Sequence, residues 1–187
     1  NGDGMFELFV THLAHEQHAL WIQGPLGFFQ DETAEFCLIN PAWRGTGFGT
    51  AMADFNLDGR LDLAFVNGLV RRGDHPGPRI AGLPPFWSAY AQQNQLFLGS
   101  SSGRFQEVTL ANPPFCSQAS VGRGLASGDI DNDGDLDLLV TSVGGPAQLF
   151  RNIAPHQGHW LAIRAIDPSL GGRDAYGAEI VIESSGQ

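Results

Sequence analysis

The sequence contains no lysine, only two cysteines and no long apolar run. All 10 cationic side chains among its 187 residues are therefore arginines, and they stand against 20 aspartates and glutamates. The formal net charge of −10 argues against nucleic acid as a partner, because phosphate backbones are bound by clustered cations. Since no run of 18 apolar residues occurs, we expect no insertion of the chain into a membrane.

The two cysteines, Cys37 and Cys116, lie far apart in the sequence and lack CxxC spacing. A cysteine metal site is therefore not expected, and the sequence leaves open whether the two thiols are paired. In contrast, glycine and proline are plentiful, with 25 and 11 residues. This composition favours many short strands and turns over long helices.

An acidic pattern recurs three times along the chain. Its form is D-x-[DN]-x-D-G-x-x-D in the two complete copies, at residues 54–62 and 129–137, and an incomplete copy occupies residues 1–7. Short β-branched or aromatic runs and glycine-rich turns follow each copy. Units of about four short strands are typical of propeller blades.

We therefore predict an all-β fold containing a partial calcium-binding β-propeller of about two and a half four-stranded blades. The predicted parts are a partial blade at residues 1–36, a blade at 37–115 with an inserted loop at 70–92, and a blade at 116–153. Residues 154–187 break the repeat. Apolar runs at 160–166 and 178–182 predict two strands that begin a small β domain. Because so few blades cannot close a ring, we expect the chain to be the C-terminal part of a longer polypeptide.

The spacing within the acidic pattern predicts calcium loops. Oxygen side chains at positions 1, 3, 5 and 9 and the carbonyl of position 7 can surround Ca²⁺, which needs six to eight oxygens, and glycine at position 6 permits the sharp turn. The predicted ligands are Asp54, Asn56, Asp58, Arg60 and Asp62 in the first complete loop, Asp129, Asp131, Asp133, Asp135 and Asp137 in the second, and Asn1, Asp3, Met5 and Glu7 in the incomplete loop, with Arg60, Asp135 and Met5 contributing their carbonyls. The alternative is an acidic turn whose side chains only cap backbone amides.

These units resemble FG-GAP/VCBS repeats, the calcium-binding blades of integrin-α-like β-propellers, at Phe48, Gly49 and the acidic loops. Residues 158–164 and 173–180 resemble the start of an ASPIC/UnbV domain, although Gly171 and Gly172 stand where that family usually has Ser-Asn. The pairing is similar to extracellular proteins related to cartilage acidic protein. The resemblance implies a calcium-stabilised propeller, typically of about seven blades, that serves adhesion or interaction.

The inserted loop carries two candidate ligand contacts. Arg72, Gly73 and Asp74 spell the tripeptide that integrins recognise, although a solvated turn is the alternative. Trp87 and Tyr90 are candidates for stacking on a sugar, with core packing as the alternative.

Two further patterns are interpreted as structural. His12, His15 and His18 follow a predicted strand, and we expect them in an exposed polar loop rather than a metal site. The glycines around 45–49 and 122–128 are expected on inner propeller strands, where neighbouring blades crowd together.

Together these features predict a non-enzymatic, calcium-stabilised binding or adhesion module. An extracellular, periplasmic or cell-surface location is expected, because low-affinity calcium loops fill where calcium is millimolar. The partner would be a protein or a glycan, besides the remainder of the chain's own polypeptide. Two alternatives stay open: a carbohydrate-binding propeller, and an accessory part of a polysaccharide-degrading enzyme whose catalytic residues lie outside this chain.

Overall fold

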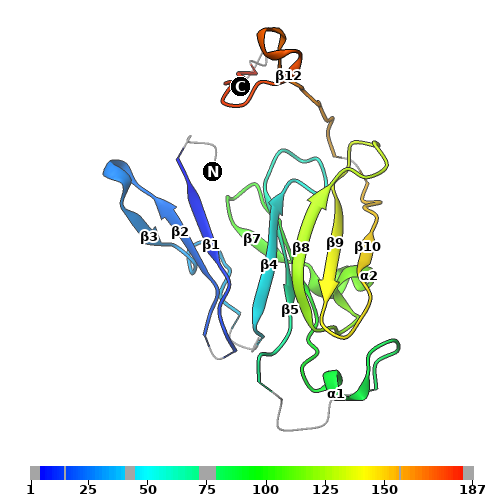
Figure 1. Ribbon diagram of the computed structural model, residues 1–187. Helices are drawn as coiled ribbons and strands as arrows, with labels where there is room; N and C mark the ends of the chain where they lie inside the picture. The colour runs from blue at the N-terminus through cyan, green and yellow to red at the C-terminus, as the bar shows by residue number, and fades with distance from the viewer. Residues whose placement is uncertain (1–4, 15, 41–44, 72–78, 156, 183–187) are drawn as a thin grey trace.

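The computed structural model describes residues 5–14, 16–40, 45–71, 79–155 and 157–182. These residues form mainly short strands in several antiparallel sheets, with few helices (Figure 1). The helical elements are single turns: α1 (Pro85–Ser88), α2 (Pro113–Cys116), η1 (Pro25–Gly27), η2 (Thr109–Ala111) and η3 (Pro168–Leu170). None of the described helices is long and apolar enough to cross a bilayer. The mostly β character predicted from composition is confirmed.

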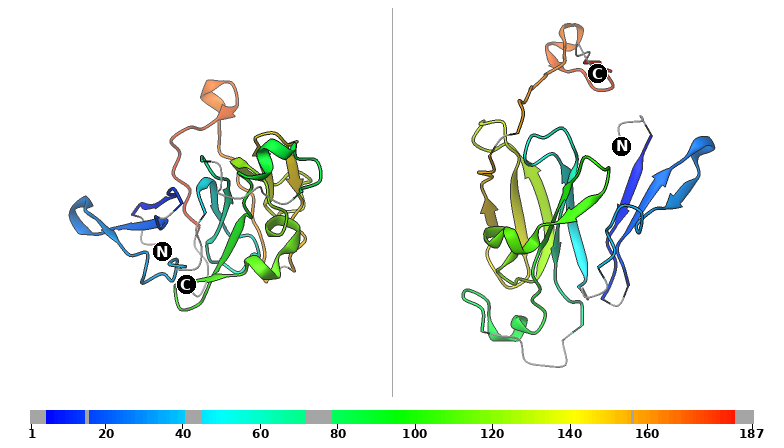
Figure 2. Two further views of the ribbon diagram at one scale, coloured as in Figure 1. Left: turned by 90° about the horizontal axis from the view of Figure 1, so that it is seen from below. Right: turned by 180° about the vertical axis from the view of Figure 1, so that it is seen from behind.

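Three sheets carry the repeat. The first consists of β1 (Glu7–Val10), β2 (Ala19–Gln23) and β3 (Phe29–Asp31), the second of β4 (Gly47–Ala53), β5 (Asp62–Asn67), β6 (Gln95–Gly99) and β7 (Phe105–Glu107), and the third of β8 (Gly122–Gly128), β9 (Asp137–Ser142) and β10 (Gln148–Phe150). Within each sheet, strands that follow one another in the chain pair antiparallel. Within the described residues the sheets do not close into a ring (Figure 2).

Strand register repeats between the second and third sheets. Ala53 pairs with Asp62, and Gly128 pairs with Asp137, so loops of equal length join the first two strands of both sheets. A register shift also occurs near the start of β4 and of β8. The two complete copies of the acidic pattern therefore occupy equivalent places in equivalent sheets.

Apolar side chains fill the spaces between adjacent sheets. The cluster between the first and second sheets consists of Leu20, Leu38, Leu63, Phe65 and Phe97. The cluster between the second and third sheets consists of Ala51, Phe55, Ala64, Val66, Leu96, Phe115, Cys116, Leu138 and Val140. Every residue of β5 is buried, because sheets cover both of its faces.

Glycines allow the innermost strands to touch. A methyl group built on Gly49 of β4 would overlap the backbone of Gly124 and Leu125 in β8. Likewise, a methyl group on Gly122 would collide with Val66. The prediction that these glycines lie where sheets crowd together is confirmed for Gly49 and Gly122, whereas a methyl group on Gly128 would meet nothing within 4 Å.

Since His12 is half-buried, the predicted exposure is wrong for it and equally for the half-buried His18. The His18 ring stands edge-on to Phe65 at 4.8 Å, and its Nδ1 accepts a hydrogen bond of 3.0 Å from the amide of His12. Burial, and secondarily repulsion from His12, lower the pKa of His18 to about 4. The β1–β2 connection folds against the start of β4, where the amide of Gly47 donates to the His12 carbonyl at 3.1 Å. His15 lies outside the described residues.

The C-terminal segment contains less β-structure than predicted. Its strands, β11 (Ile166–Asp167) and β12 (Arg173–Asp174), form a short hairpin around η3. Apart from Ile166, residues 160–166 and 178–182 are not strands, so both predicted strands are wrong. Leu161 and Val181 are 68% and 73% exposed, and no neighbouring sheet among the described residues pairs with these runs.

Both cysteines are free thiols. Cys116 is buried in the cluster between the second and third sheets, whereas Cys37 is exposed. Burial raises the pKa of Cys116 to about 12, so its thiol stays protonated at neutral pH.

Candidate metal centre

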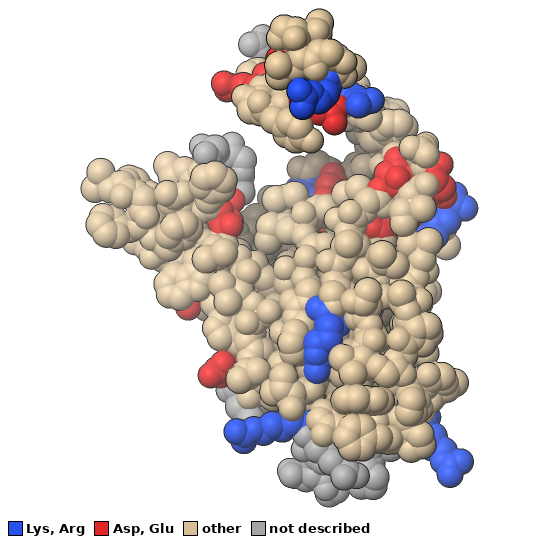
Figure 3. Space-filling view, in the orientation of Figure 1, with Lys and Arg blue, Asp and Glu red and all other residues tan. Residues whose placement is uncertain are grey.

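The two complete acidic loops lie at the same end of the sheets. Asp54 follows β4 directly and Asp62 opens β5, while Asp129 follows β8 and Asp137 opens β9. Acidic side chains gather at this end of the molecule (Figure 3). The repeated strand pairing thus places the two predicted sites side by side.

The carboxylate at position 9 anchors each loop. One of its oxygens accepts from the amide of position 2, and the other accepts from the segment at the end of the sheet's third strand. The four amides are those of Phe55 (2.9 Å) and Gly99 (2.8 Å) to Asp62, and those of Ile130 (3.1 Å) and Asn152 (2.8 Å) to Asp137. Asp62 and Asp137 are 0% and 3% exposed, so these bonds hold buried carboxylates in place.

The carboxylate at position 1 closes the turn. Its two oxygens accept from the amides of positions 5 and 6, which are Asp58 (3.1 Å) and Gly59 (2.7 Å) for Asp54, and Asp133 (3.1 Å) and Gly134 (3.0 Å) for Asp129. The backbone is left-handed at positions 4 and 6 in both loops, with φ of 55° and 81° at Leu57 and Gly59, and 61° and 93° at Asn132 and Gly134. Glycine at position 6 therefore has the conformational role predicted for it.

In the second loop, three predicted ligands meet. Carboxylate oxygens of Asp129, Asp131 and Asp137 lie within 4.8 Å of one another. Oxygens that bind one Ca²⁺ at 2.3–2.6 Å are at most about 5 Å apart, so the cluster fits a single ion. Among the described residues, the first loop has no such group of three carboxylates, because Asn56 occupies position 3 there. Its amide oxygen is still a ligand of the type that calcium accepts.

Arginines neutralise part of each loop. Arg151 contacts Asp131 through Nε at 2.5 Å and Asp133 through Nη2 at 3.0 Å. Its hydrogen bond to Asp133 and the charge of Asp131 raise the pKa of Arg151. In the first loop, Arg60 contacts Asp58 at 2.6 Å. Sequence reasoning assigned Arg60 a carbonyl role only, and it did not consider Arg151.

The negative charge of the buried Asp62 carboxylate is offset little by other side chains. Burial raises the pKa of this carboxyl to about 6, although the amides of Gly99 and Phe55 act in the opposite direction. The charges of Asp58 and Asp54 raise it further. A cation between these carboxylates would reverse both unfavourable effects.

The incomplete loop is described only at its end. Glu7 is the first residue of β1, as Asp62 is of β5 and Asp137 of β9, so its place is that of position 9. Met5 precedes it, and Asn1 and Asp3 lie outside the described residues. Metal binding by this loop remains a prediction.

Comparison with known proteins agrees with this repeated geometry. Residues 82–140 match the family model of the FG-GAP-like repeat. The chain is also 26% identical over 196 residues to cartilage acidic protein 1 of Mus musculus, an alignment that covers 83% of this chain. The chain spans only 30% of the length of that relative.

The FG-GAP-like match suggests an integrin-like β-propeller module. It runs from the start of α1 to β9 and contains the whole second acidic loop. The first loop lies outside the matched range, yet it repeats the bonding of the second at positions 1 and 9. Strand register and hydrogen bonding therefore extend the repeat where the family model does not reach.

Trp87 and Tyr90, two of the candidate ligand contacts, lie away from the acidic loops (Figure 1). Trp87 and Tyr90, inside the FG-GAP-like range, form an aromatic group with Phe86, and Trp87 also lies against Gly144. Both predicted residues are half-buried, whereas Phe86 is 59% exposed and was not predicted. Arg72, Gly73 and Asp74 lie outside the described residues.

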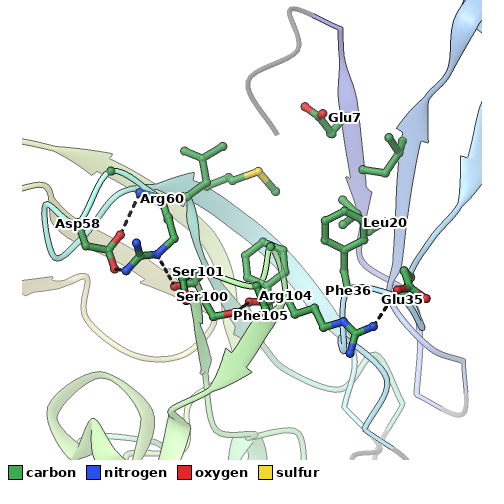
Figure 4. Close-up of a pocket in the computed structure, with 17 residues that line it drawn as sticks. Glu7, Leu20, Glu35, Phe36, Asp58, Arg60, Ser100, Ser101, Arg104 and Phe105 are labelled. Carbon is green, nitrogen blue, oxygen red and sulfur yellow. Dashed lines mark hydrogen bonds and ion pairs between the residues drawn. The ribbon is translucent and has the colours of Figure 1, made fainter. Parts of the chain in front are cut away.

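A cavity of about 920 Å³ lies beside the first acidic loop, between the first and second sheets (Figure 4). The turn between β6 and β7, residues 100–104, forms part of its wall. Arg104 on this turn pairs with Glu35 at 2.8 Å, and Phe36 and Phe105 contribute aromatic surface. The sequence contains no signal for this cavity, because its lining residues come from two separate sheets.

Proposed function

We propose that this chain is part of a non-enzymatic β-propeller binding module whose two complete acidic loops bind structural Ca²⁺. The observation that supports this most directly is the shared hydrogen-bond scaffold, which presents carboxylates at the same positions of both loops. The close group of Asp129, Asp131 and Asp137 adds to it. FG-GAP-like repeats commonly bind calcium, which agrees with the proposal.

The proposed ligands are those predicted from the spacing. Asp54, Asn56, Asp58 and Asp62 would hold the first ion, and Asp129, Asp131, Asp133 and Asp137 the second, each with the carbonyl of position 7, from Arg60 or Asp135. A bound Ca²⁺ supplies two positive charges to each loop. Because the ligands of each ion come from one loop, the ion would stabilise the loop rather than activate a substrate.

The alternative, an acidic turn that only caps amides, accounts for the same hydrogen bonds. It does not exclude a metal, because a carboxylate has about four lone-pair positions and capping uses only one or two. Capping would orient the ligands in advance. It leaves the buried charge of Asp62 without a cation, and that charge is the feature that calcium would compensate.

For the whole module we propose adhesion or another binding role, in an extracellular, periplasmic or cell-surface setting. Support comes from the FG-GAP-like match and from the similarity to cartilage acidic protein 1. The partner would be a protein or a glycan, together with the remainder of the chain's own polypeptide.

Calcium removal tests the proposal directly. A chelator should lower the melting temperature of the wild-type chain, and the double variant Asp58→Ala, Asp133→Ala should lose most of that sensitivity. Glu35→Ala, which removes an exposed acidic residue, is the matched control and should keep it. A melting curve that does not change with excess chelator would count decisively against structural calcium.

One observation favours the carbohydrate-binding alternative. The cavity beside the first loop combines the aromatic rings of Phe36 and Phe105 with the polar Ser100 and Arg104 (Figure 4). Aromatic surface with nearby hydrogen-bonding groups suits a sugar ring. Binding to a glycan array that Phe105→Ala abolishes, with the fold intact, would favour this function. Cleavage products from a polysaccharide panel would instead favour the enzyme-accessory alternative.

A further inference from the structure

The chain crosses both acidic loops after it leaves β10. We propose that the described residues of 152–160, here called the latch, close over the two loops in concert with cation binding, so that the ions determine where the C-terminal segment sits. This proposal rests on the calcium binding proposed above. It adds a positioning role for residues that are not themselves ligands.

On the first loop, the latch contacts three consecutive carbonyl groups. The side-chain amide of Asn152 donates to the carbonyl of Phe55 at 2.6 Å. The backbone amide of Gln157 donates to the carbonyl of Asn56 at 3.0 Å. Gly158 lies against the carbonyl of Leu57 so closely that a methyl group there would collide with it.

On the second loop, the latch contacts positions 6 and 9. The amide of Asn152 donates to the carboxylate of Asp137 at 2.8 Å. The indole ring of Trp160 lies against Gly134, where a methyl group would overlap the ring. The same short segment therefore holds both loops, through Asn152 at one end and Trp160 at the other.

These contacts form only when each acidic loop adopts its tight turn. The carbonyls of Phe55, Asn56 and Leu57 take their directions from a turn in which Leu57 is left-handed, and Gly134 is left-handed as well. Without a cation, repulsion between neighbouring carboxylates works against that turn. A cation that binds the carboxylates stabilises the turn, and so it stabilises the surface on which the latch sits.

Among the described residues, the latch makes few other contacts. Ile153 is 83% exposed and Trp160 is 49% exposed, and no described residue of the latch belongs to a strand. A single hydrogen bond contributes little net free energy. The latch therefore closes only when the two loops adopt the conformation that offers all of these contacts together. Linkage then works in both directions: opening the latch must weaken cation binding by the same factor by which cations favour closure.

Closure of the latch would fix the position of the C-terminal hairpin formed by β11 and β12. In Figures 1 and 2 the segment that carries β11 and β12 lies beyond the loop end of the sheets. This segment exposes apolar side chains, among them Leu161, Tyr176 and Val181 at 68%, 94% and 73%. Cation binding would therefore present this apolar surface in one defined position.

Tryptophan fluorescence tests the latch in the whole chain. The contribution of Trp160 is obtained as the difference between wild type and Trp160→Phe, and calcium should reduce the quenching of this contribution by acrylamide. Gly158→Ala, which pushes the latch off Leu57, should abolish that protection and raise the calcium Kd at least about fivefold in calorimetry. Gly145→Ala is the control, because a methyl group there meets only Ser142, at an ordinary 3.9 Å, and it should change neither quantity.

The outcomes separate the two proposals. If calorimetry detects no calcium binding to the wild type, the calcium function is wrong and the latch with it. If calcium binds but Trp160 is equally quenched with and without it, and Gly158→Ala keeps the wild-type Kd, the latch alone is overturned. Should Gly158→Ala fail to fold by circular dichroism, Trp160→Ala provides the same Kd comparison at an exposed side chain, and an unchanged Kd there also overturns the latch.

Discussion

The side-chain amide of Asn152 donates a 2.6 Å hydrogen bond to the carbonyl of Phe55, although 97 positions separate the two residues. Through its backbone amide the same residue binds Asp137 in the other acidic loop. Asn152 therefore links the second sheet to the third at the end where both candidate metal sites lie. Its side-chain Oδ1 is used too, as acceptor for the backbone amide of Ala154 at 3.0 Å.

Replacing Asn152 by Asp should lower the free energy of unfolding by about 1 to 3 kcal/mol, because an acceptor then faces the Phe55 carbonyl instead of a donor. The bonds to Asp137 and Ala154 remain available, and the negative charge that the change adds is matched in the control variant. Urea unfolding measures the loss. Asn40→Asp, which alters an exposed hydrogen bond to Glu107, is the control, and an equal loss in both variants would contradict a special role for Asn152.

Arg151 should compete with the cation in the second loop. Its guanidinium contacts both Asp131 and Asp133, so a bound Ca²⁺ would meet a positive charge beside its ligands. Arg151→Gln should therefore tighten calcium binding roughly threefold to tenfold, and more strongly at low ionic strength. Titration calorimetry measures the affinity, with Arg104→Gln as the control in an ion pair outside the two loops. Weaker binding in Arg151→Gln would show that Arg151 positions the ligands instead.

Close approach of β4 and β8 makes Gly49 sensitive to any side chain. Gly49→Ala should destabilise the fold by about 1 to 3 kcal/mol or more, because its methyl group meets the backbone of Leu125, which cannot move aside easily. Gly128→Ala is the matched control at the other end of the same pair of strands, where a methyl group meets nothing within 4 Å. Thermal unfolding of the two variants should therefore differ, and equal melting temperatures would contradict the tight strand contact.

His18 should make stability depend on pH. Its folded pKa of about 4 lies below the unfolded value of 6.5, so the unfolded chain binds a proton first as the pH falls. The contribution of neutral His18 to the free energy of unfolding is fully present above about pH 6.5. It is lost progressively as the pH falls to about 4, by at most about 3 kcal/mol. Urea unfolding between pH 7.5 and pH 4, compared between wild type and His18→Leu, measures this loss.

The comparison with His18→Leu is needed because Asp62 acts in the opposite direction. Its folded pKa of about 6 is raised above the ordinary value of 3.8, so ionisation of the unfolded chain costs stability as the pH rises through this range. Asp62 is present in both proteins, and its contribution cancels in the difference. If the two pH profiles run parallel, His18 is not the titrating group.

Sequence spacing predicted the acidic loops well because each is a local structure. Asp54 and Asp58, like Asp129 and Asp133, are linked by hydrogen bonds that span a few residues, and glycine at position 6 provides the left-handed turn. Such contacts depend on residue order alone. The crowded glycines of β4 and β8 were predicted for a similar reason, since a repeat places equivalent strands side by side.

Other features could not be predicted because they join distant segments. The burial of His18 depends on how the β1–β2 connection meets β4, and the cavity depends on two sheets that face each other. The strands expected at residues 160–166 and 178–182 do not form, because a strand forms only where another strand accepts its hydrogen bonds.

By itself, the sequence determined the repeated acidic turns, the oxygen-bearing side chains proposed as their ligands, and the β character of the chain, because short-range hydrogen bonding and alternating apolar side chains specify these. Tertiary structure alone decided that Asn152 contacts both loops, that Trp160 lies against the second loop, and that Arg151 neutralises two of the proposed ligands. The physical reason is that the contact between Asn152 and Phe55 forms only after the second and third sheets have packed against each other and brought their acidic loops to one end.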